Sequence, residues 1–110
     1  MRASEAIDAL GALAQEHRLQ LFRLLVQAGA EGMAAGELAR AIDIPNSSLS
    51  FHHGHLQRSG LIGQRRAGRS LIYSADYRAM DRLVAYLMEN CCGGADCAPT
   101  HVREGQKEDA

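Results

Sequence analysis

The stretch 37-ELARAIDIPNSSLSFHHGHLQRSGLI-62 determines how this chain folds. Apolar residues recur at helical spacing up to Pro45, which disfavours helix in the residue before it. Asn46 or Ser47 can cap a second helix, and Gly60 ends that helix. Two short helices around a tight turn are typical of a helix-turn-helix, whose second helix enters the major groove of DNA.

The flanking sequence predicts further elements on both sides of this unit. A helix capped by Ser4 and a second one over residues 16–29 precede it, a hairpin with arms 61–65 and 70–74 around the turn 66–69 follows it, and a helix capped by Asp76 runs to Asn90. We therefore predict a mainly α (α+β) fold, a winged helix-turn-helix of about five helices and a β-hairpin wing. It forms one DNA-binding and dimerisation domain over residues 1–92, and residues 93–110 form a flexible tail.

A helical wheel separates the second helix of the unit into two faces. Leu49, His53 and Leu56 share the inward side, and the opposite side together with the arginines of the hairpin forms the predicted DNA surface. The predicted DNA-binding residues are Ser47, Ser48, Ser50, Phe51, His52, Gly54, His55, Arg58, Arg65, Arg66 and Arg69. Hydroxyls can reach phosphates or base edges, an outward phenylalanine can pack on a thymine methyl, and arginines can follow the phosphate backbone.

The charge distribution agrees with a polyanionic partner. The net charge of the 110 residues is only -1, but residues 46–82 carry six arginines against two acids. Such a basic zone in a neutral protein favours double-stranded DNA, although an exposed charged loop would have the same composition.

Length and composition limit the other possibilities. The chain has no run of about 18 apolar residues and no signal-peptide pattern at its start, so we expect no membrane partner and a cytoplasmic protein with reduced thiols. A core this small favours self-association, and the apolar stripes of the first and last helices predict a homodimer.

The helix-turn-helix stretch resembles the ArsR/SmtB metal-responsive repressors. The residues that carry the resemblance, within a match over roughly residues 4–90, are Ser50, His52, Leu56, Gly60, Leu61 and Ile62. The resemblance implies a dimeric repressor of operator DNA that senses an ion. His53 departs from the family pattern, which usually has leucine there, and an inward histidine costs desolvation free energy unless its nitrogens find partners.

All three cysteines lie in 89-ENCCGGADCAP-99. Cys91, Cys92 and Cys97 can converge on one soft ion because two glycines allow the chain to fold back. Three sulfurs suit trigonal-pyramidal As(III) or Sb(III), whereas tetrahedral Zn(II) needs a fourth ligand such as His101, and Cd or Pb rank with zinc. The resemblance also points to trivalent arsenic, since some family members carry a C-terminal cysteine trio.

Two other uses of the thiols stay open: a redox switch, for which a disulfide from Cys92 to Cys97 is the feasible pairing, or no function. We do not expect an enzyme, because these cysteines follow a helix end instead of starting a helix, where an anion would bind. The predicted mechanism is release of the operator when the metalloid binds.

Overall fold

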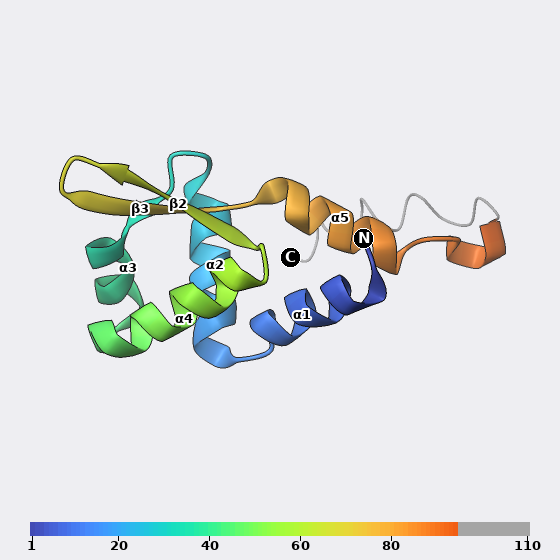
Figure 1. Ribbon diagram of the computed structural model, residues 1–110, viewed down its shortest axis with the longest axis horizontal. Coiled ribbons are helices and arrows are strands. Elements are labelled where there is room, and N and C mark those ends of the chain that lie inside the picture. The colour runs from blue at the N-terminus through green and yellow to red at the C-terminus, as the bar shows by residue number, and fades with distance from the viewer. Residues whose placement is uncertain (95–110) are drawn as a thin grey trace.

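The computed structural model describes residues 1–94, which form five α-helices, three strands and one 3-10 turn (Figure 1). In chain order the elements are α1 Ala3–Leu13, α2 Glu16–Ala28, β1 Met33–Ala34, α3 Ala35–Ile42, α4 Asn46–Arg58, β2 Ile62–Ala67, β3 Ser70–Ala75, α5 Tyr77–Leu87 and the 3-10 turn Cys91–Gly94. The predicted winged helix-turn-helix is confirmed. Within residues 1–94, every helix is too short or too polar to cross a lipid bilayer.

The wing is an antiparallel hairpin of β2 and β3. Pairing runs from Ile62 opposite Ala75 to Ala67 opposite Ser70, so the strands are longer than predicted and only Gly68 and Arg69 form the tip. Gly68 has a φ of +64°, as a two-residue hairpin turn requires. The hairpin prediction is confirmed with a tighter turn.

A third strand, β1, was not predicted. Its two residues pair with Tyr73 and Ile72, which gives the sheet order β1-β3-β2. Two residues are too few to display an alternating pattern. Gly32 precedes the strand at a φ of +73°, and a Cβ there would collide with the carbonyl oxygen of Tyr73, so only glycine fits.

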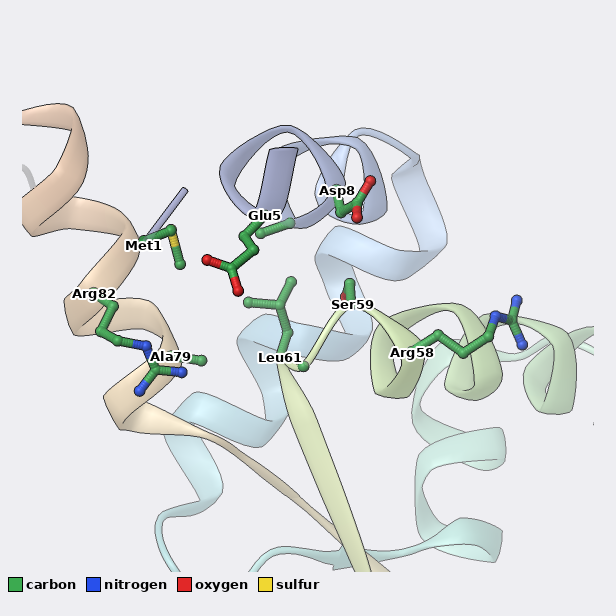
Figure 2. Close-up of a pocket in the computed structure, with 10 residues that line it drawn as sticks. Met1, Glu5, Asp8, Arg58, Ser59, Leu61, Ala79 and Arg82 are labelled. Carbon is green, nitrogen blue, oxygen red and sulfur yellow. The ribbon is translucent and has the colours of Figure 1, made fainter. Parts of the chain in front are cut away.

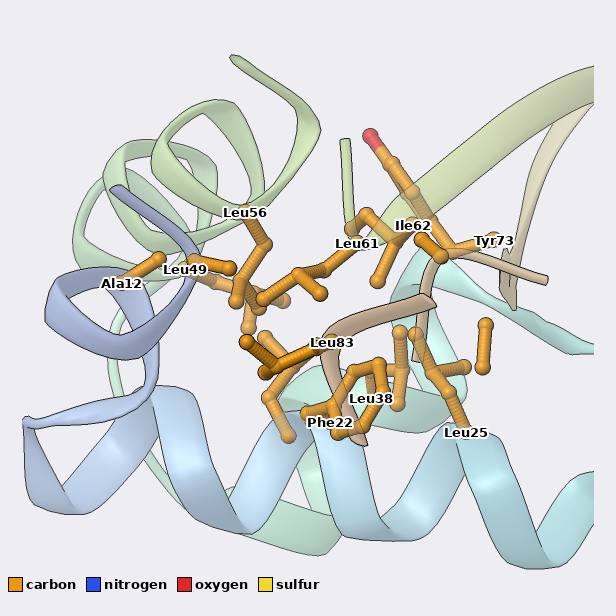
Figure 3. Packing of buried hydrophobic residues seen from close by; sticks show 14 of the residues in the cluster. Ala12, Phe22, Leu25, Leu38, Leu49, Leu56, Leu61, Ile62, Tyr73 and Leu83 are labelled. Atoms are coloured by element: carbon orange, nitrogen blue, oxygen red, sulfur yellow. The ribbon is translucent and has the colours of Figure 1, made fainter. Parts of the chain in front are cut away.

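The hydrophobic core surrounds α2. Figure 3 shows Phe22 and Leu25 from α2 packed with Leu38 of α3 and Leu83 of α5. The largest fully buried side chains are Leu21, Leu25, Leu38, Leu56 and Leu61. Because Leu56 comes from α4, the core fixes this helix against the rest of the domain.

The first helix buries its alanines and leaves its larger apolar side chains exposed. Its buried residues are Ala6, Ala9 and Ala12, whereas Ile7 is 66% exposed and Leu10 is 43% exposed. Alanines allow α1 to lie close to its neighbours, which leaves the larger side chains outside. The predicted cap at Ser4 is wrong, since the helix begins earlier.

Several other boundaries differ from the prediction. Pro45 stands at the cap position of α4 in place of Asn46 or Ser47, and α5 ends at Leu87 instead of Asn90. The predicted cap of α5 is confirmed, since the Asp76 carboxylate accepts a hydrogen bond from the Ala79 backbone N–H at 3.0 Å.

Candidate nucleic-acid interface and thiol pair

Helix α4 presents a polar outward face around one exposed aromatic ring. Ser47, Ser50 and Arg58 are exposed, and Phe51 is 60% exposed. The inward residues Leu49, His53 and Leu56 are buried as the wheel predicted. Burying the Phe51 ring would be favourable, so its exposure favours a partner surface over solvent as its normal environment.

Gly54 lies at the middle of this face. A Cβ at this position would lie 3.1 Å from Nη1 of Arg58, the end of a flexible side chain, so packing within the domain does not require glycine. A glycine in a helix costs about 1 kcal/mol relative to alanine. Because glycine has no side chain, the edge of a DNA groove could approach the α4 backbone closely at this position. Ser48 and His55 are partly exposed beside it.

The wing carries the other cationic side chains. Arg65, Arg66 and Arg69 are exposed. Arg65 also donates from Nη2 to the carbonyl oxygen of Glu31 at 3.1 Å, which fixes one edge of its guanidinium against the loop before β1. Figure 1 shows the hairpin projecting beyond the helices, so its tip can reach a phosphate backbone beside the groove that α4 would enter.

The prediction that His52 lies on the surface is wrong. Its side chain is buried, and its Nδ1 lies 3.4 Å from Nη1 of Arg18. The ring of His17 lies 5.6 Å from the His52 ring. The start of α2 packs over this part of α4, a contact that the local sequence of α4 does not reveal. His52 is therefore removed from the surface that could touch DNA directly.

Sequence reasoning missed Arg18. It is 8% exposed, and its Nε donates to the carbonyl oxygen of Ala12. The available signal was an arginine at a core-facing helical position, four residues before Phe22 and seven before Leu25. A charged residue at such a position needs buried partners.

The inward orientation of His53 is confirmed. Its ring lies 3.8 Å from the Tyr73 ring, and its Nε2 is buried without a hydrogen-bond partner among residues 1–94. Burial, followed by the neighbouring His52, lowers the pKa of His53 to about 4, and burial raises the pKa of Tyr73. His53 is therefore a neutral contact between the reading helix and the wing.

His55 is half-buried, and its Nδ1 also lacks a partner within the described part of the chain. Desolvation, then Arg18 and Arg58, lower its pKa. A neutral ring at the edge of the outward face can accept or donate one hydrogen bond, which leaves His55 suited to contact DNA.

The thiols lie at the far end of α5 from the reading helix (Figure 1). Sγ of Cys91 and Sγ of Cys92 are 3.7 Å apart in the turn Cys91–Gly94. Cys92 is disulfide-bonded in this structure. The third predicted ligand, Cys97, lies outside the described residues, as do His101 and most of the predicted tail. Residues 1–94 hold no group of three potential metal ligands.

A pocket of about 250 Å³ lies between α1, the end of α4 and α5 (Figure 2). Figure 2 shows Glu5 pointing toward this space from α1, and Arg58 at the end of α4 also lines it. The Glu5 carboxylate already accepts a hydrogen bond from the Arg2 backbone N–H at 2.7 Å, which lowers its pKa. The pocket contains no thiol, so it is separate from the candidate ion site.

Known proteins with this arrangement are DNA-binding regulators. A family described as a helix-turn-helix domain matches residues 13–65. The transcriptional activator HlyU of Vibrio cholerae is 31% identical over 85 residues, which cover 74% of this chain and 76% of HlyU. The structure of NolR from Sinorhizobium fredii is similar at 30% identity, with a TM-score of 0.64, over 81% of this chain and 86% of that one.

The chain belongs to the ArsR/SmtB family of transcriptional regulators. Another ArsR/SmtB-like fold is the homodimeric winged helix-turn-helix DNA-binding domain of Mb0332 from Mycobacterium bovis, at 22% identity with a TM-score of 0.64 over 86% of this chain and 87% of that one. As an ArsR/SmtB protein the chain is a DNA-binding regulator and not an enzyme. The resemblance read from the helix-turn-helix stretch is confirmed at the level of the family.

Proposed function

We propose that the chain is a cytoplasmic, metalloid-responsive transcriptional repressor that binds operator DNA as a homodimer. The homodimer is released from the operator when As(III) or Sb(III) binds Cys91, Cys92 and Cys97. The observation that carries the proposal is that all three cysteines lie within seven residues, two of them adjacent in the turn Cys91–Gly94 that follows α5. Repression, rather than the activation named for HlyU, is the role that the resemblance to the ArsR/SmtB repressors implies.

The sulfur geometry fits one shared ion. Two thiolates that bind one zinc ion at about 2.3 Å lie roughly 3.5–4 Å apart. The 3.7 Å between the sulfurs of Cys91 and Cys92 is therefore short enough for both to reach one ion once Cys92 is reduced. Thiolates favour soft, thiophilic ions, and three of them without a fourth ligand suit a trivalent metalloid with a lone pair. A Zn response ranks behind it because tetrahedral zinc favours a fourth ligand, and Cd and Pb responses rank with zinc.

The dimer part of the proposal rests on apolar side chains that the domain leaves exposed. On α5, Val84 is 50% exposed and Leu87 is 56% exposed, and on the adjacent α1 Ile7 and Leu10 are exposed as well. A second copy can cover both helices at once through a two-fold interface. Two α4 helices held about 34 Å apart would then reach successive major grooves.

The thiol turn connects directly to this proposed interface. The backbone N–H of Cys91 donates to the carbonyl oxygen of Met88 at 2.9 Å, and the N–H of Met88 donates to Val84 at 3.0 Å. Closing Cys97 onto an ion would therefore constrain the end of α5. A coupling free energy of about 1–3 kcal/mol between the two sites would be ordinary for such regulators.

A metalloid titration of the protein–DNA complex tests the proposal. A duplex selected from a random pool by the reduced protein replaces the unknown operator. We expect arsenite to weaken binding by about 5- to 150-fold and each of Cys91→Ser, Cys92→Ser and Cys97→Ser to reduce that effect. Equal duplex affinity with and without bound arsenite would refute the switch while leaving DNA binding intact.

The disulfide at Cys92 favours a second candidate, a thiol redox-responsive repressor. A disulfide sulfur is not a thiolate, so oxidation and metalloid binding exclude each other at this residue. The same titration with a mild oxidant in place of arsenite separates the two. Release by oxidant alone, with no response to arsenite under reducing conditions, would select the redox switch.

A further inference from the structure

Arg18 connects three helices. From its place in the first turn of α2, its Nε donates to the carbonyl oxygen of Ala12 at 2.6 Å, near the end of α1. Its Nη1 lies 3.4 Å from Nδ1 of His52, in the middle of the reading helix α4. One side chain thus ties the reading helix to α1.

Both acceptors suit a buried guanidinium for physical reasons. Ala12 lies in the last turn of α1, where the helix dipole places partial negative charge. Arginine stays protonated, so a buried guanidinium needs acceptors to offset its lost hydration. Within residues 1–94 the Arg18 guanidinium has two hydrogen-bond acceptors, the Ala12 carbonyl oxygen and His52 Nδ1, and neither is a carboxylate. Without the His52 acceptor, the N–H groups of Nη1 would be buried with neither water nor a hydrogen-bond acceptor.

The His52 contact exists only while the imidazole is neutral. Nδ1 must be an acceptor, so the ring proton has to lie on Nε2. The groups that face this ring are Arg18 and His17 from α2 and His55 from its own helix, and none is acidic. Burial first, and then these three groups, lower the pKa of His52, which favours the neutral form. Protonation would place a cation against the guanidinium.

We propose that Arg18 is a positioning residue for DNA recognition, which orients the reading helix through an acceptor on neutral His52. The inference rests on the DNA-binding role of the chain and does not involve the thiols. Phe51 is the next residue along α4 and its ring meets the His52 ring at 5.5 Å, edge to face. Loss of the link would rotate or loosen the part of α4 that carries Phe51.

The proposal predicts the opposite pH response from a histidine that touches phosphate. A phosphate-contacting histidine strengthens DNA binding when it gains a proton. The link instead weakens as the pH falls through the pKa of His52, which burial places below the ordinary histidine value of about 6.5. Lower pH would thus disfavour DNA binding through His52.

Two substitutions separate the acceptor from the rest of the ring. His52→Asn places an amide oxygen at the same number of bonds from the backbone as Nδ1, and it does not titrate. His52→Gln places its amide near the position of Nε2 and leaves Arg18 without its acceptor. Near pH 8 we expect the affinity of His52→Asn for a selected duplex to stay within about threefold of wild type and that of His52→Gln to fall about tenfold.

The affinity ratio of wild type to His52→Asn is then compared near pH 8 and near pH 5.5. His17 and His55 are present in both proteins, so their titrations cancel in the ratio. We expect wild type to lose affinity relative to His52→Asn at the lower pH, because only wild type carries a group at position 52 that gains a proton. A constant ratio, or a relative gain by wild type, would overturn the proposal.

A spectroscopic measurement covers the case in which a variant does not fold. The nitrogen chemical shifts of His52 in the wild-type protein report its tautomer, and the proposal requires the proton on Nε2. A proton on Nδ1 would overturn it. A wild-type protein without an arsenite response would refute the proposed thiol switch and leave these results unchanged.

Discussion

Phe51 is an aromatic side chain that the isolated domain leaves uncovered. Its ring meets the rings of His52 and His55 only at their edges. For Phe51→Ala we expect the free energy of unfolding to change by less than about 0.5 kcal/mol, because the domain gains little from an exposed ring.

The same substitution should weaken binding to a selected duplex by about 1–3 kcal/mol, since a base contact is lost. Anisotropy titrations and urea unfolding measure the two quantities. Unchanged affinity, or equal losses for selected and random duplexes, would remove Phe51 from the reading surface. Ser50→Ala, on the same face, provides the small-side-chain comparison.

His53 makes the stability of the domain depend on pH. Its folded pKa of about 4 lies below the unfolded value of about 6.5, so the unfolded chain binds more protons between these values. Its contribution is fully present above pH 6.5 and is lost as the pH falls toward 4, by up to about 3 kcal/mol. Urea unfolding should show a weaker loss of stability in His53→Leu over this range.

The substitution His53→Leu should also stabilise the domain at neutral pH by roughly 1–2 kcal/mol, since it removes the unpartnered Nε2. Identical slopes of stability against pH in the two proteins would contradict the assignment of this titration to His53.

The orientation of His53 could be predicted from the sequence, but that of His52 could not. Helical spacing from Leu49 to Leu56 places His53 inward regardless of what lies across the core. His52 sits at the border of the two faces, and its burial depends on Arg18, 34 residues earlier in the chain. Periodicity describes a helix in isolation and does not reveal which neighbour covers its edge.

At the level of elements, the wing should contribute affinity without sequence preference. Arg66 and Arg69 are exposed on the hairpin. Changing each to glutamine should reduce the slope of log affinity against log salt by about one per phosphate contact, with base preference unchanged. Duplex titrations over a salt series give the slope. A changed base preference with an unchanged slope would instead assign these arginines to base reading.

Arg65 should behave differently from its neighbours. Its guanidinium donates to the carbonyl oxygen of Glu31, so it also holds the wing against the loop before β1. Its replacement should therefore alter wing dynamics as well as the salt slope.

The presence and order of the helices could be predicted from the sequence. Which face of each helix packs against the core could be predicted only for some of them. For α1 the stripe with Ile7 and Leu10, which was assigned to a dimer interface, is exposed, whereas the core-facing Ala9 and Ala12 were not predicted. Alanine contributes weakly to any hydrophobic pattern, and its value here is that it lets two helices approach closely, which is a property of the pair. The strand β1 was missed because its two residues gain their pairing only from β3.

For the whole molecule, the exposed side chains of α1 and α5 predict the oligomeric state. Leu87→Asp should convert a dimer into monomers, because a carboxylate would be buried without a partner. Sedimentation at several concentrations measures this. Leu19→Asp is the matched control, since Leu19 is 46% exposed on α2, outside the proposed interface. Monomeric wild-type protein, or equal dissociation in both variants, would place the interface elsewhere.

The contacts between Gly32, β1 and Tyr73 determine which part of such a dimer can change its conformation on DNA. The glycine backbone closes on the Tyr73 carbonyl, Met33 pairs with Tyr73, and the Tyr73 ring stacks on His53 of α4. These contacts connect the wing, β1 and the reading helix, so we expect a bent or overtwisted duplex to move the three together. Each protomer should tilt as a block, which leaves the junction between protomers as the hinge that adapts to differences in half-site spacing.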